Sequence, residues 1–487
     1  MTPISRRTLL AAGAAAGALA ILPAAARTLD APLLLNDASQ LNTTPVARLW
    51  RRKAGLDGAW LDELRTELKT AAAEGRPVAV GAARHSMGGQ ALPRDGVAMS
   101  LDVDVASRDP WIALDPATRT YRVAAGGRWG QVIKVLDAAG FSPAVMQSNN
   151  DFGVGATLSV NAHGWPTPYG PFGATVHSFR LMLGSGELVT CSHAENPELF
   201  ALAVGGYGLF GIVTDVDLEM VENTLLRPSF ELTPSAEIGP RLIAALDRDS
   251  SVRMAYGRLS VDARAFLREA MLVTYRPVPG APPPADSGGL GLDFARDVFR
   301  AQIGSDAGKR ARWYIETVLT PAATSGETSR NTLLNEPVAN LAGQERSRTD
   351  ILHEYFLPPE GLEPFLAACS AIIPASRQDL LNVTLRYVDQ DRASVLSYAH
   401  GRRVGAVMLF SQRMTLVDDE DMRAMTERMI DACLEAGGSF YLPYRLHARK
   451  DQFARAYPRL DEFLDCKRRY DPELLFRNLM WDRYFAV

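Results

Sequence analysis

The sequence predicts an α+β protein with more than one structural unit, and three observations support this. The chain has 487 residues, of which 47% are hydrophobic and 22% charged, as in compact globular proteins. Up to about residue 222, short apolar runs of strand length alternate with single amphipathic helices. From residue 223 the amphipathic segments become longer, which indicates a second unit.

In the first unit, apolar residues at helical spacing predict two helices. In one helix the apolar residues span 60–68, and Gly75 is expected just after its end. In the other they span 129–136, and Gly140 follows its end. Asp115-Pro116 lies between two strand patterns and predicts a hairpin turn. The predicted strands cover residues 77–80, 97–103, 112–114, 121–124, 176–183, 187–191 and 209–220.

Two later segments have clear local signals. The run from Pro277 to Leu290 is rich in proline and glycine and predicts a surface loop. The segment from Phe453 to Tyr470 has the pattern of one amphipathic helix that ends at Asp471-Pro472.

Charge and cysteine content exclude several classes of protein. Lys and Arg number 52 against 56 Asp and Glu, a formal net charge of -4, so no electrostatic footprint for a nucleic-acid partner is present. The 4 cysteines include no C-x-x-C pair, which argues against a zinc knuckle or a disulfide scaffold. We therefore predict no metal site and no nucleic-acid partner.

Residues 1–26 have the pattern of a twin-arginine signal peptide. Arg6 and Arg7 precede a weakly apolar stretch from Leu9 to Leu22, which is shorter than the ~18 residues that a membrane-spanning helix needs. We expect cleavage after Ala26, export in the folded state, and a periplasmic or extracellular protein with no integral membrane segment after cleavage.

The first unit contains three glycine-rich stretches, of which the first follows a strand pattern and the third leads into one. They run from Gly81 to Gln90, from Gly153 to Gly164 and from Gly205 to Thr214. Small residues let backbone N–H groups approach a ligand closely, so such turns can cradle a pyrophosphate. Each also has a purely structural interpretation, as a turn, a loop between strands or tight strand packing.

Taken in this order, the three stretches resemble the flavin-binding domain of the vanillyl-alcohol oxidase superfamily, the PCMH-type FAD-binding fold. The segment from Asn196 to Thr214, NPELF...GGYGLFGIVT, is typical of these proteins. The closing segment from Tyr457 to Asn478 is similar to that of the aldonolactone oxidase and decaprenylphosphoryl-ribose oxidase branches. The resemblance implies a two-lobed FAD-binding domain over 43–222, an inserted α+β cap (substrate) domain over 223–440, and a C-terminal segment, 441–487, that returns to the FAD domain.

The resemblance also implies which residues contact FAD. In this family the first two stretches wrap the pyrophosphate, and the third approaches the adenine end. The implied FAD-binding residues are Gly81, Ala82, Ala83, Arg84, His85, Ser86, Gln90, Gln147, Ser148, Gly153, Gly155, Thr157, Ser159, His163, Gly164, Gly211, Ile212, Val213 and Asn478.

His85 stands before Ser86 where relatives of this type carry a histidine bonded to the flavin 8α-methyl carbon. A neutral imidazole nitrogen is a competent nucleophile for that carbon. The resemblance thus implies FAD covalently attached through His85. The segment from Met146 to Asn150 contains no cysteine, so a second covalent link there is excluded.

The chain departs from the family in the expected catalytic region. Sugar-lactone and alditol oxidases show a Glu-x-Arg on a cap strand, whereas this chain has Thr384-Leu385-Arg386. The arginine is present and the acid is missing, so Arg386 is either a substrate contact or a solvated charge on the strand. The candidate catalytic residues are Arg386, which orients the substrate oxygen, Tyr387 or Tyr444 as its hydrogen-bonding partner, and Arg445 as a cationic neighbour of the reduced flavin.

The predicted function is that of an FAD-dependent oxidoreductase acting on CH–OH donors. A sugar, lactone or other alcohol would lose a hydride to flavin N5 and a proton to a side chain. Its partners would be a small-molecule substrate and an electron acceptor, either oxygen or a redox partner. Two alternatives remain: a reductase of carbon–carbon double bonds, and a flavin-carrying electron-transfer or binding protein without a small-molecule substrate.

Overall fold

The structure is a computed structural model that describes residues 32–107, 109–280, 283, 292–323, 326–337, 345 and 347–486. The predicted signal peptide, 1–26, lies outside the described residues. Residues Leu33–Val487 form one compact unit.

Of the loop predicted from Pro277 to Leu290, the described part comprises the residues through Gly280 together with Pro283, and the rest lies outside the described residues. No helix within the described residues is both long enough and apolar enough to cross a membrane.

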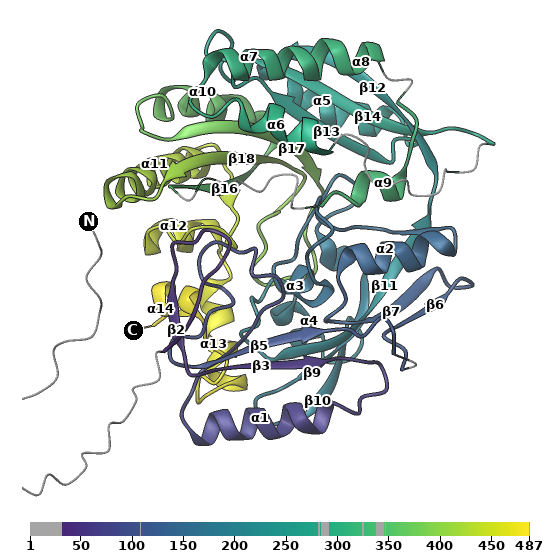
Figure 1. Cartoon of the computed structure of the whole chain (residues 1–487), viewed down its shortest axis with the longest axis vertical. Coiled ribbons are helices and arrows are strands. Elements are labelled where there is room, and N and C mark those ends of the chain that lie inside the picture. The colour runs from purple at the N-terminus through teal and green to yellow at the C-terminus, as the bar shows by residue number, and fades with distance from the viewer. Residues whose placement is uncertain are drawn as a thin grey trace, which may run out of the picture. The chain divides into compact units, whose positions relative to one another are not determined.

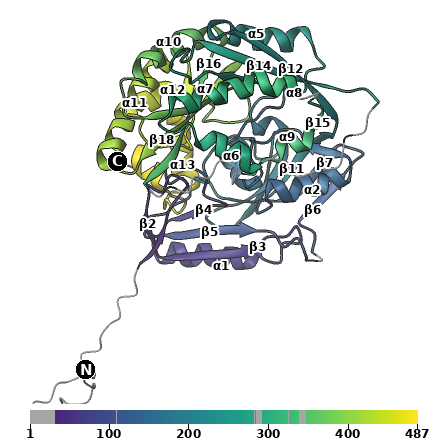
Figure 2. The ribbon, with the colours of Figure 1, turned by 45° about the horizontal axis from the view of Figure 1, so that its top comes forward.

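The FAD-binding half predicted from sequence contains two sheets. Parallel strands form the first, in the spatial order β3 (Arg48–Lys53), β5 (Val97–Asp102) and β4 (Val78–Val80). Helix α1 (Leu61–Ala73) runs along this sheet, as Figures 1 and 2 both show, and buries Leu64 and Leu68 against it. The predicted helix therefore forms because its apolar residues share one face.

The second sheet is antiparallel and matches the predicted strand patterns closely. Its spatial order is β10 (Leu188–Ser192), β9 (Val176–Met182), β11 (Ile212–Glu222), β7 (Thr120–Ala124) and β6 (Ile112–Asp115), with β8 (Phe141–Pro143) paired to the end of β11. The helices around it are α2 (Trp129–Ala138), α3 (Val154–Ser159) and α4 (Pro197–Ala203). A short hairpin of β1 (Leu33–Leu35) and β2 (Thr44–Val46) precedes both sheets.

The chain changes sheet between Glu222 and Leu225, next to the boundary predicted at residue 223. The cap sheet then runs in the spatial order β15 (Thr328–Ser329), β12 (Leu225–Pro234), β14 (Glu269–Pro277), β13 (Met254–Leu259), β17 (Asp379–Val388), β18 (Arg403–Arg413), β16 (Arg348–Leu357) and β19 (Ser439–Phe440). Its strands occupy the upper half of Figure 1.

Each face of the cap sheet has its own helices. On one face, α5 (Ser235–Arg248), α10 (Leu362–Ile372) and α11 (Leu416–Glu435) share a core with the sheet residues. On the other face, α6 (Leu292–Arg300) and α7 (Asp306–Tyr314) lie over β17 and β18, since Phe299 packs against Leu409 and the Arg312 guanidinium donates to the Leu381 carbonyl. The short helices of this half also include α8 (Thr320–Ala323), α9 (Arg330–Leu334), the π-helix η2 (Ile315–Leu319) and the 3-10 helix η4 (Pro359–Gly361).

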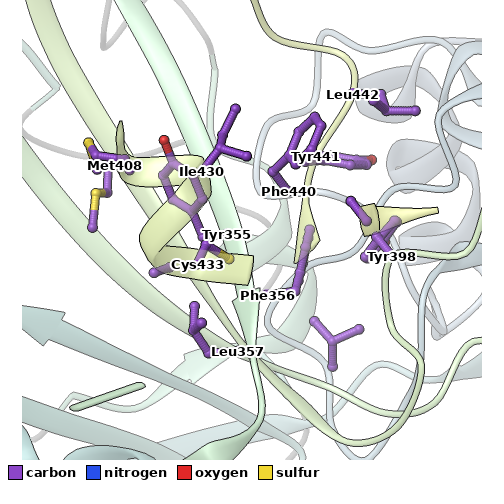
Figure 3. Packing of buried hydrophobic residues seen from close by; sticks show 14 of the residues in the cluster. Tyr355, Phe356, Leu357, Tyr398, Met408, Ile430, Cys433, Phe440, Tyr441 and Leu442 are labelled. Atoms are coloured by element: carbon purple, nitrogen blue, oxygen red, sulfur yellow. The ribbon is translucent and has the colours of Figure 1, made fainter. Parts of the chain in front are cut away.

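Aromatic side chains join the cap to the segment that follows it. Phe356 of β16 stacks on Tyr398 with ring centroids 4.2 Å apart and meets Tyr441 edge-on at 5.7 Å. Figure 3 shows these rings together with Ile430 and Cys433 of α11. Such contacts bury large apolar surfaces, so the start of the C-terminal segment is fixed on the cap core.

The C-terminal segment continues as α12 (Lys450–Ala456), α13 (Leu460–Tyr470) and α14 (Leu479–Tyr484). The single helix predicted from Phe453 to Tyr470 is thus wrong, because Pro458 lacks the N–H that an unbroken helix requires and the chain turns there. After α13 the chain reaches the first sheet, where Phe476 pairs with Val78 of β4.

One buried lysine fixes this return. The Lys467 ammonium donates to the Leu209 and Phe476 carbonyl oxygens at 2.5 and 2.7 Å and to Asp471 at 2.5 Å. Burial lowers the pKa of Lys467 to about 8, against the opposing effect of Asp471. The three acceptors replace the water that the ammonium loses, and they hold the third glycine-rich stretch against the C-terminal segment.

Candidate active site

A cavity of about 1710 Å³ is lined by the first two glycine-rich stretches and by the cap sheet. This volume exceeds the roughly 1,000 Å³ upper end for a pocket that holds one ligand. The predicted site residues that line it are Gly81, Ala82, Ala83, Arg84, His85, Ser86, Gln90, Gln147, Ser148, Gly153, Gly155, Ser159, His163, Val213, Arg386 and Tyr444.

The first stretch follows β4 and is held in place by close backbone packing. A Cβ atom at Gly88 would lie 2.4 Å from the Tyr444 carbonyl oxygen, so this position requires glycine. The Gln90 side chain accepts from the Gly88 N–H at 2.9 Å and donates to the Leu442 carbonyl at 2.6 Å. The loop is therefore tied to the C-terminal segment.

Arg84 is the clearest candidate for an anion contact in this stretch. Its Nε and Nη2 atoms are buried and have no hydrogen-bond partner among the residues that the structure describes. Burial lowers the pKa of Arg84, and the nearby Arg51 and Arg128 lower it further. A partly buried guanidinium without a carboxylate partner suits a pyrophosphate, which would supply both the charge and the acceptors.

The second stretch packs tightly against the first. A Cβ atom at Gly153 would lie 2.9 Å from the Ala82 Cβ, and one at Gly155 would lie 2.8 Å from the Ala125 Cβ. Thr157 lies behind this surface, where its hydroxyl donates to the Gln147 side chain at 2.9 Å. Thr157 thus positions a cavity-lining residue and does not itself line the cavity.

His85 lies at the junction of the two stretches. Its Nε2 atom donates to Asp151 Oδ2 at 2.7 Å, and its ring centroid lies 4.6 Å from that of Phe152. In a neutral imidazole, a hydrogen bond donated by Nε2 leaves the lone pair on Nδ1. The contact with Asp151 therefore fixes the orientation of the ring and leaves Nδ1 without a partner in that pair.

Arg386 connects the cap to the second stretch. Its Nη2 atom donates to the Ser148 hydroxyl at 2.7 Å, and its Nη1 atom donates to the His163 carbonyl oxygen at 3.4 Å. Because side chains alternate along β17, Arg386 faces the cavity with Asn382 and Thr384.

An acid missed in the sequence analysis lies near Arg386. Glu354 of β16 lies with Oε1 2.6 Å from His163 Nε2, and its Oε2 accepts from the Tyr444 hydroxyl at 3.1 Å. Burial by itself would raise the pKa of Glu354, but His163, Arg386 and the Tyr444 hydrogen bond outweigh it and lower the pKa. The cavity thus has an ionised carboxylate, although β17 carries none beside Arg386.

One strand, β18, separates the strand of the acid from the strand of the arginine. Gly405 of β18 pairs with Arg386 on one side and with Phe356 on the other. A Cβ atom at Gly405 would lie 3.1 Å from the Phe356 ring and 3.5 Å from Glu354 Oε1, so the glycine gives the Phe356 ring room on this face. The only sequence signal for Glu354 is a charged residue within the apolar run ILHEYFL.

A second polar group of side chains lies further along the cap sheet. Arg258 of β13 donates to Asn382 and Thr384, both at 2.6 Å, and Arg312 donates to Glu316 at 2.9 Å. These donors and acceptors satisfy one another and form one wall of the cavity.

Glu336 lines the cavity from the segment after α9. Burial raises the pKa of its carboxyl group, while Arg258 and Arg386 oppose the rise. Its backbone carbonyl accepts from the Asn150 N–H at 3.0 Å, which joins this cap segment to the second glycine-rich stretch.

The structure does not bring two of the proposed catalytic residues to the cavity. Tyr387 lies on the opposite face of β17 from Arg386 and is buried in the cap core, as the strand's alternation requires. Arg445 pairs with Asp419 at 3.0 Å and donates to Asn42 at 3.0 Å, so its charge is already compensated away from the cavity.

Four of the implied FAD-binding residues also have structural roles away from the cavity lining. A Cβ atom at Gly164 would lie 2.0 Å from the Met146 carbonyl oxygen, and one at Gly211 would lie 2.6 Å from that of Met182. Ile212 is buried in the core of the FAD-binding half. Asn478 accepts from the Trp481 N–H at 3.0 Å and caps α14.

Comparisons with known proteins agree with this geometry. Residues 60–192 match the family of FAD binding domains. Cytokinin dehydrogenase 4 of Arabidopsis thaliana is 38% identical over 132 residues, which are 27% of this chain and 25% of that protein. Cytokinin dehydrogenase 8 of Oryza sativa subsp. japonica is 39% identical over 145 residues, 28% of this chain and 27% of that protein. The matched segment thus spans about a quarter of these relatives.

The fold is similar to that of 6-hydroxy-D-nicotine oxidase from Arthrobacter nicotinovorans, with a TM-score of 0.61 and 18% identity over 91% of this chain and 93% of that chain. The chain contains an FAD-binding domain, and the resemblance to the vanillyl-alcohol oxidase superfamily is confirmed. The predicted α+β class with a two-lobed FAD-binding fold is confirmed as well.

Arg84→Ala is expected to weaken FAD binding by about tenfold or more, since a charge-assisted hydrogen bond contributes roughly 1.5–3 kcal/mol. Titration of apoprotein with FAD, followed by quenching of flavin fluorescence in a His85→Ala background, measures the affinity without a covalent bond. Arg119→Ala is the control, because Arg119 is exposed in the turn between β6 and β7 and pairs with Glu222. Equal affinities for the two variants would exclude Arg84 from FAD binding.

Proposed function

We propose that the protein is an FAD-linked oxidase or dehydrogenase that oxidises a CH–OH group of a sugar, lactone or other alcohol. The observation that carries the proposal is the convergence of Arg386, Tyr444 and Glu354 on a cavity lined by the FAD-binding loops. Bound FAD would supply the two-electron acceptor at flavin N5. Oxygen or a redox partner would then remove the electrons.

Arg386 would orient the substrate oxygen. Its contacts with Ser148 and the His163 carbonyl hold the guanidinium at the border between the cap and the FAD loops. A fixed cation is favourable beside an oxygen on which negative charge develops as the hydride leaves. The same contacts keep the guanidinium from moving away when the substrate binds.

The hydroxyl proton would pass through Tyr444 to Glu354, and His163 would stabilise the Glu354 carboxylate. The raised pKa of Tyr444, caused by burial and then by Glu354, keeps the phenol protonated, so it can pass a proton on while accepting one. Glu354 has a lowered pKa and is ionised near neutral pH, so it can receive that proton. His163 stabilises the carboxylate from the other side.

A CH–NH donor is the second candidate substrate class. The relatives named above are cytokinin dehydrogenases and a nicotine oxidase, and their names point to nitrogen-containing compounds. Glu336 offers a carboxyl group inside the cavity that could pair with a cationic nitrogen. Anaerobic bleaching of the flavin by panels of alcohols and of amines separates the two classes.

Arg386→Ala is expected to slow anaerobic flavin reduction by about 10²–10³-fold, the usual effect of removing one preorganised donor, while leaving the flavin content unchanged. Glu354→Gln should slow the same step, since the amide cannot accept the proton. Stopped-flow absorbance measures both rates. Arg413→Ala, at the exposed end of β18, is the control and should reduce at the wild-type rate. An unchanged rate in Arg386→Ala would remove this residue from the mechanism.

We also propose that FAD is covalently attached through His85 Nδ1. The hydrogen bond from Nε2 to Asp151 supports this assignment, because it leaves Nδ1 as the nucleophilic atom. Phe152 and Asp151 would hold the ring in place during attachment.

Acid-precipitated wild-type protein should keep its yellow colour and carry the mass of one FAD. His85→Ala should release all of its flavin, and Asp151→Asn should retain the flavin but attach it covalently more slowly. Denaturing mass spectrometry at timed intervals after adding FAD to apoprotein follows the reaction. A colourless wild-type precipitate would contradict the covalent bond while leaving FAD binding intact.

We propose, finally, that the protein is exported by the twin-arginine route to the periplasm or beyond. Replacing Arg6 and Arg7 with lysine should leave unprocessed protein in the cytoplasm. Cell fractionation with mass analysis of the N-terminus measures this, and export of the double variant at the wild-type level would contradict the proposal.

A further inference from the structure

Glu336 has a carboxyl group that the proposed proton transfer does not use. It lines the cavity from the segment after α9, and the described part of the chain offers this carboxyl group no hydrogen bond and no ion pair. The backbone of the same residue is fixed, since its carbonyl oxygen accepts from the Asn150 N–H at 3.0 Å. The segment is thus anchored to the second glycine-rich stretch, while the side chain is available to a ligand.

Two arginines locate this carboxyl group beside the junction of β13 and β17. Burial raises the pKa of Glu336, and the charges of Arg258 and Arg386 oppose the rise, so both guanidinium groups lie near it. In the strand register Tyr256 pairs directly with Arg386, and Arg258 is two residues further along β13. Glu336 therefore lies on the β13 side of Arg386, whereas Glu354 comes from β16, on the other side of β17.

Thr384 adds a hydroxyl group to the same part of the wall. It pairs with Arg258 across the two strands, and its Oγ1 atom accepts from Arg258 Nη1 at 2.6 Å and from Asn382 Nδ2 at 3.1 Å. The hydroxyl hydrogen of Thr384 has no acceptor among the residues that the structure describes, so it can be donated to a ligand. We call the wall formed by Glu336, Thr384 and Arg258 the Glu336 subsite.

The Glu336 subsite suits a neutral hydroxyl group better than a charged group. A hydroxyl group can donate to the Glu336 carboxylate and accept from the Thr384 hydroxyl at the same time. A protonated amine has no lone pair for Thr384, and Arg258 and Arg386 would repel it. A carboxylate has no hydrogen to donate and would face the like charge of Glu336. The subsite thus discriminates between the substrate classes that the proposed function leaves open.

We propose that Glu336 determines specificity by accepting a hydrogen bond from a second hydroxyl group of the substrate, on the β13 side of the CH–OH group that reacts at Arg386. The substrate is then a diol or a polyol, and neither a monohydric alcohol nor an amine. The inference rests on the proposed function for the identity of the reacting group. It goes further by giving Glu336 a role in substrate binding and by narrowing the substrate class.

The test measures anaerobic binding and flavin reduction of the holoenzyme with matched five-carbon compounds: 1-pentanol, 1,2-pentanediol, 1,3-pentanediol and 2-amino-1-pentanol. The flavin difference spectrum gives each Kd. At least one diol should bind about tenfold more tightly than 1-pentanol, the usual effect of a hydrogen bond to a charged group, and the amino alcohol should not. If 1-pentanol or the amino alcohol binds as tightly as both diols, the proposal is wrong.

Two substitutions of Glu336 show whether its carboxylate causes the difference. Glu336→Met removes the acceptor at a similar side-chain length, so the Kd of the preferred diol should rise to that of 1-pentanol, while the Kd of 1-pentanol stays unchanged. Glu336→Gln keeps a neutral acceptor and should give an intermediate Kd for the diol. Glu363→Gln, at an exposed position of α10, is the control and should alter neither compound. An equal rise for both compounds in Glu336→Met would overturn the proposal.

The two proposals fail in different ways. If a diol binds tightly and needs Glu336 for this, but no alcohol reduces the flavin, the Glu336 subsite is supported and the CH–OH reaction is wrong. If alcohols reduce the flavin and their Kd depends neither on a second hydroxyl group nor on Glu336, the reaction is supported and the subsite is wrong.

Discussion

The buried contact between His163 and Glu354 is the interaction on which the cavity depends. His163 follows the second glycine-rich stretch, Glu354 belongs to the cap sheet, and their side chains are exposed by only 3% and 2%. Phe356 and Tyr441 pack edge-on against the imidazole and help to bury it. Because removal of one partner leaves a polar group buried without compensation, the contact specifies one position of the cap sheet over the FAD loops.

The C-terminal segment completes the same arrangement from a third direction. Lys467 holds it against the end of the third glycine-rich stretch, and Gln90 holds it against the first. Tyr444 lies between these two anchors, and its hydroxyl reaches Glu354. The glycine-rich loops, the Glu354 carboxylate and the Tyr444 phenol therefore belong to one network of hydrogen bonds and packing contacts. They come from three distant parts of the chain.

Local patterns predicted most of the elements correctly, and the exceptions have physical reasons. The helices at 60–68 and 129–136 and the strands of the second sheet form where their periodicity placed them. Pro458 divides the helix predicted from Phe453 to Tyr470. The structure places Arg386 in the cavity and Tyr387 in the core, although they are neighbours, because a strand sends successive side chains to opposite faces. The sequence identified both residues as candidates, but it did not show which of the two side chains faces the cavity.

The sequence by itself determined the glycine-rich loops, the FAD-binding fold and the position of His85, because each depends on residues close together in the chain and on backbone conformations that few residue types adopt. Only the tertiary structure supplied the acid that the strand of Arg386 lacks. Glu354 comes from β16, two strands from Arg386, and lies close enough for that arginine to lower its pKa, and Arg386 reaches Ser148 from 238 residues away. Contacts of this kind depend on strand order and register, which are decided by the packing of whole sheets and not by any local pattern.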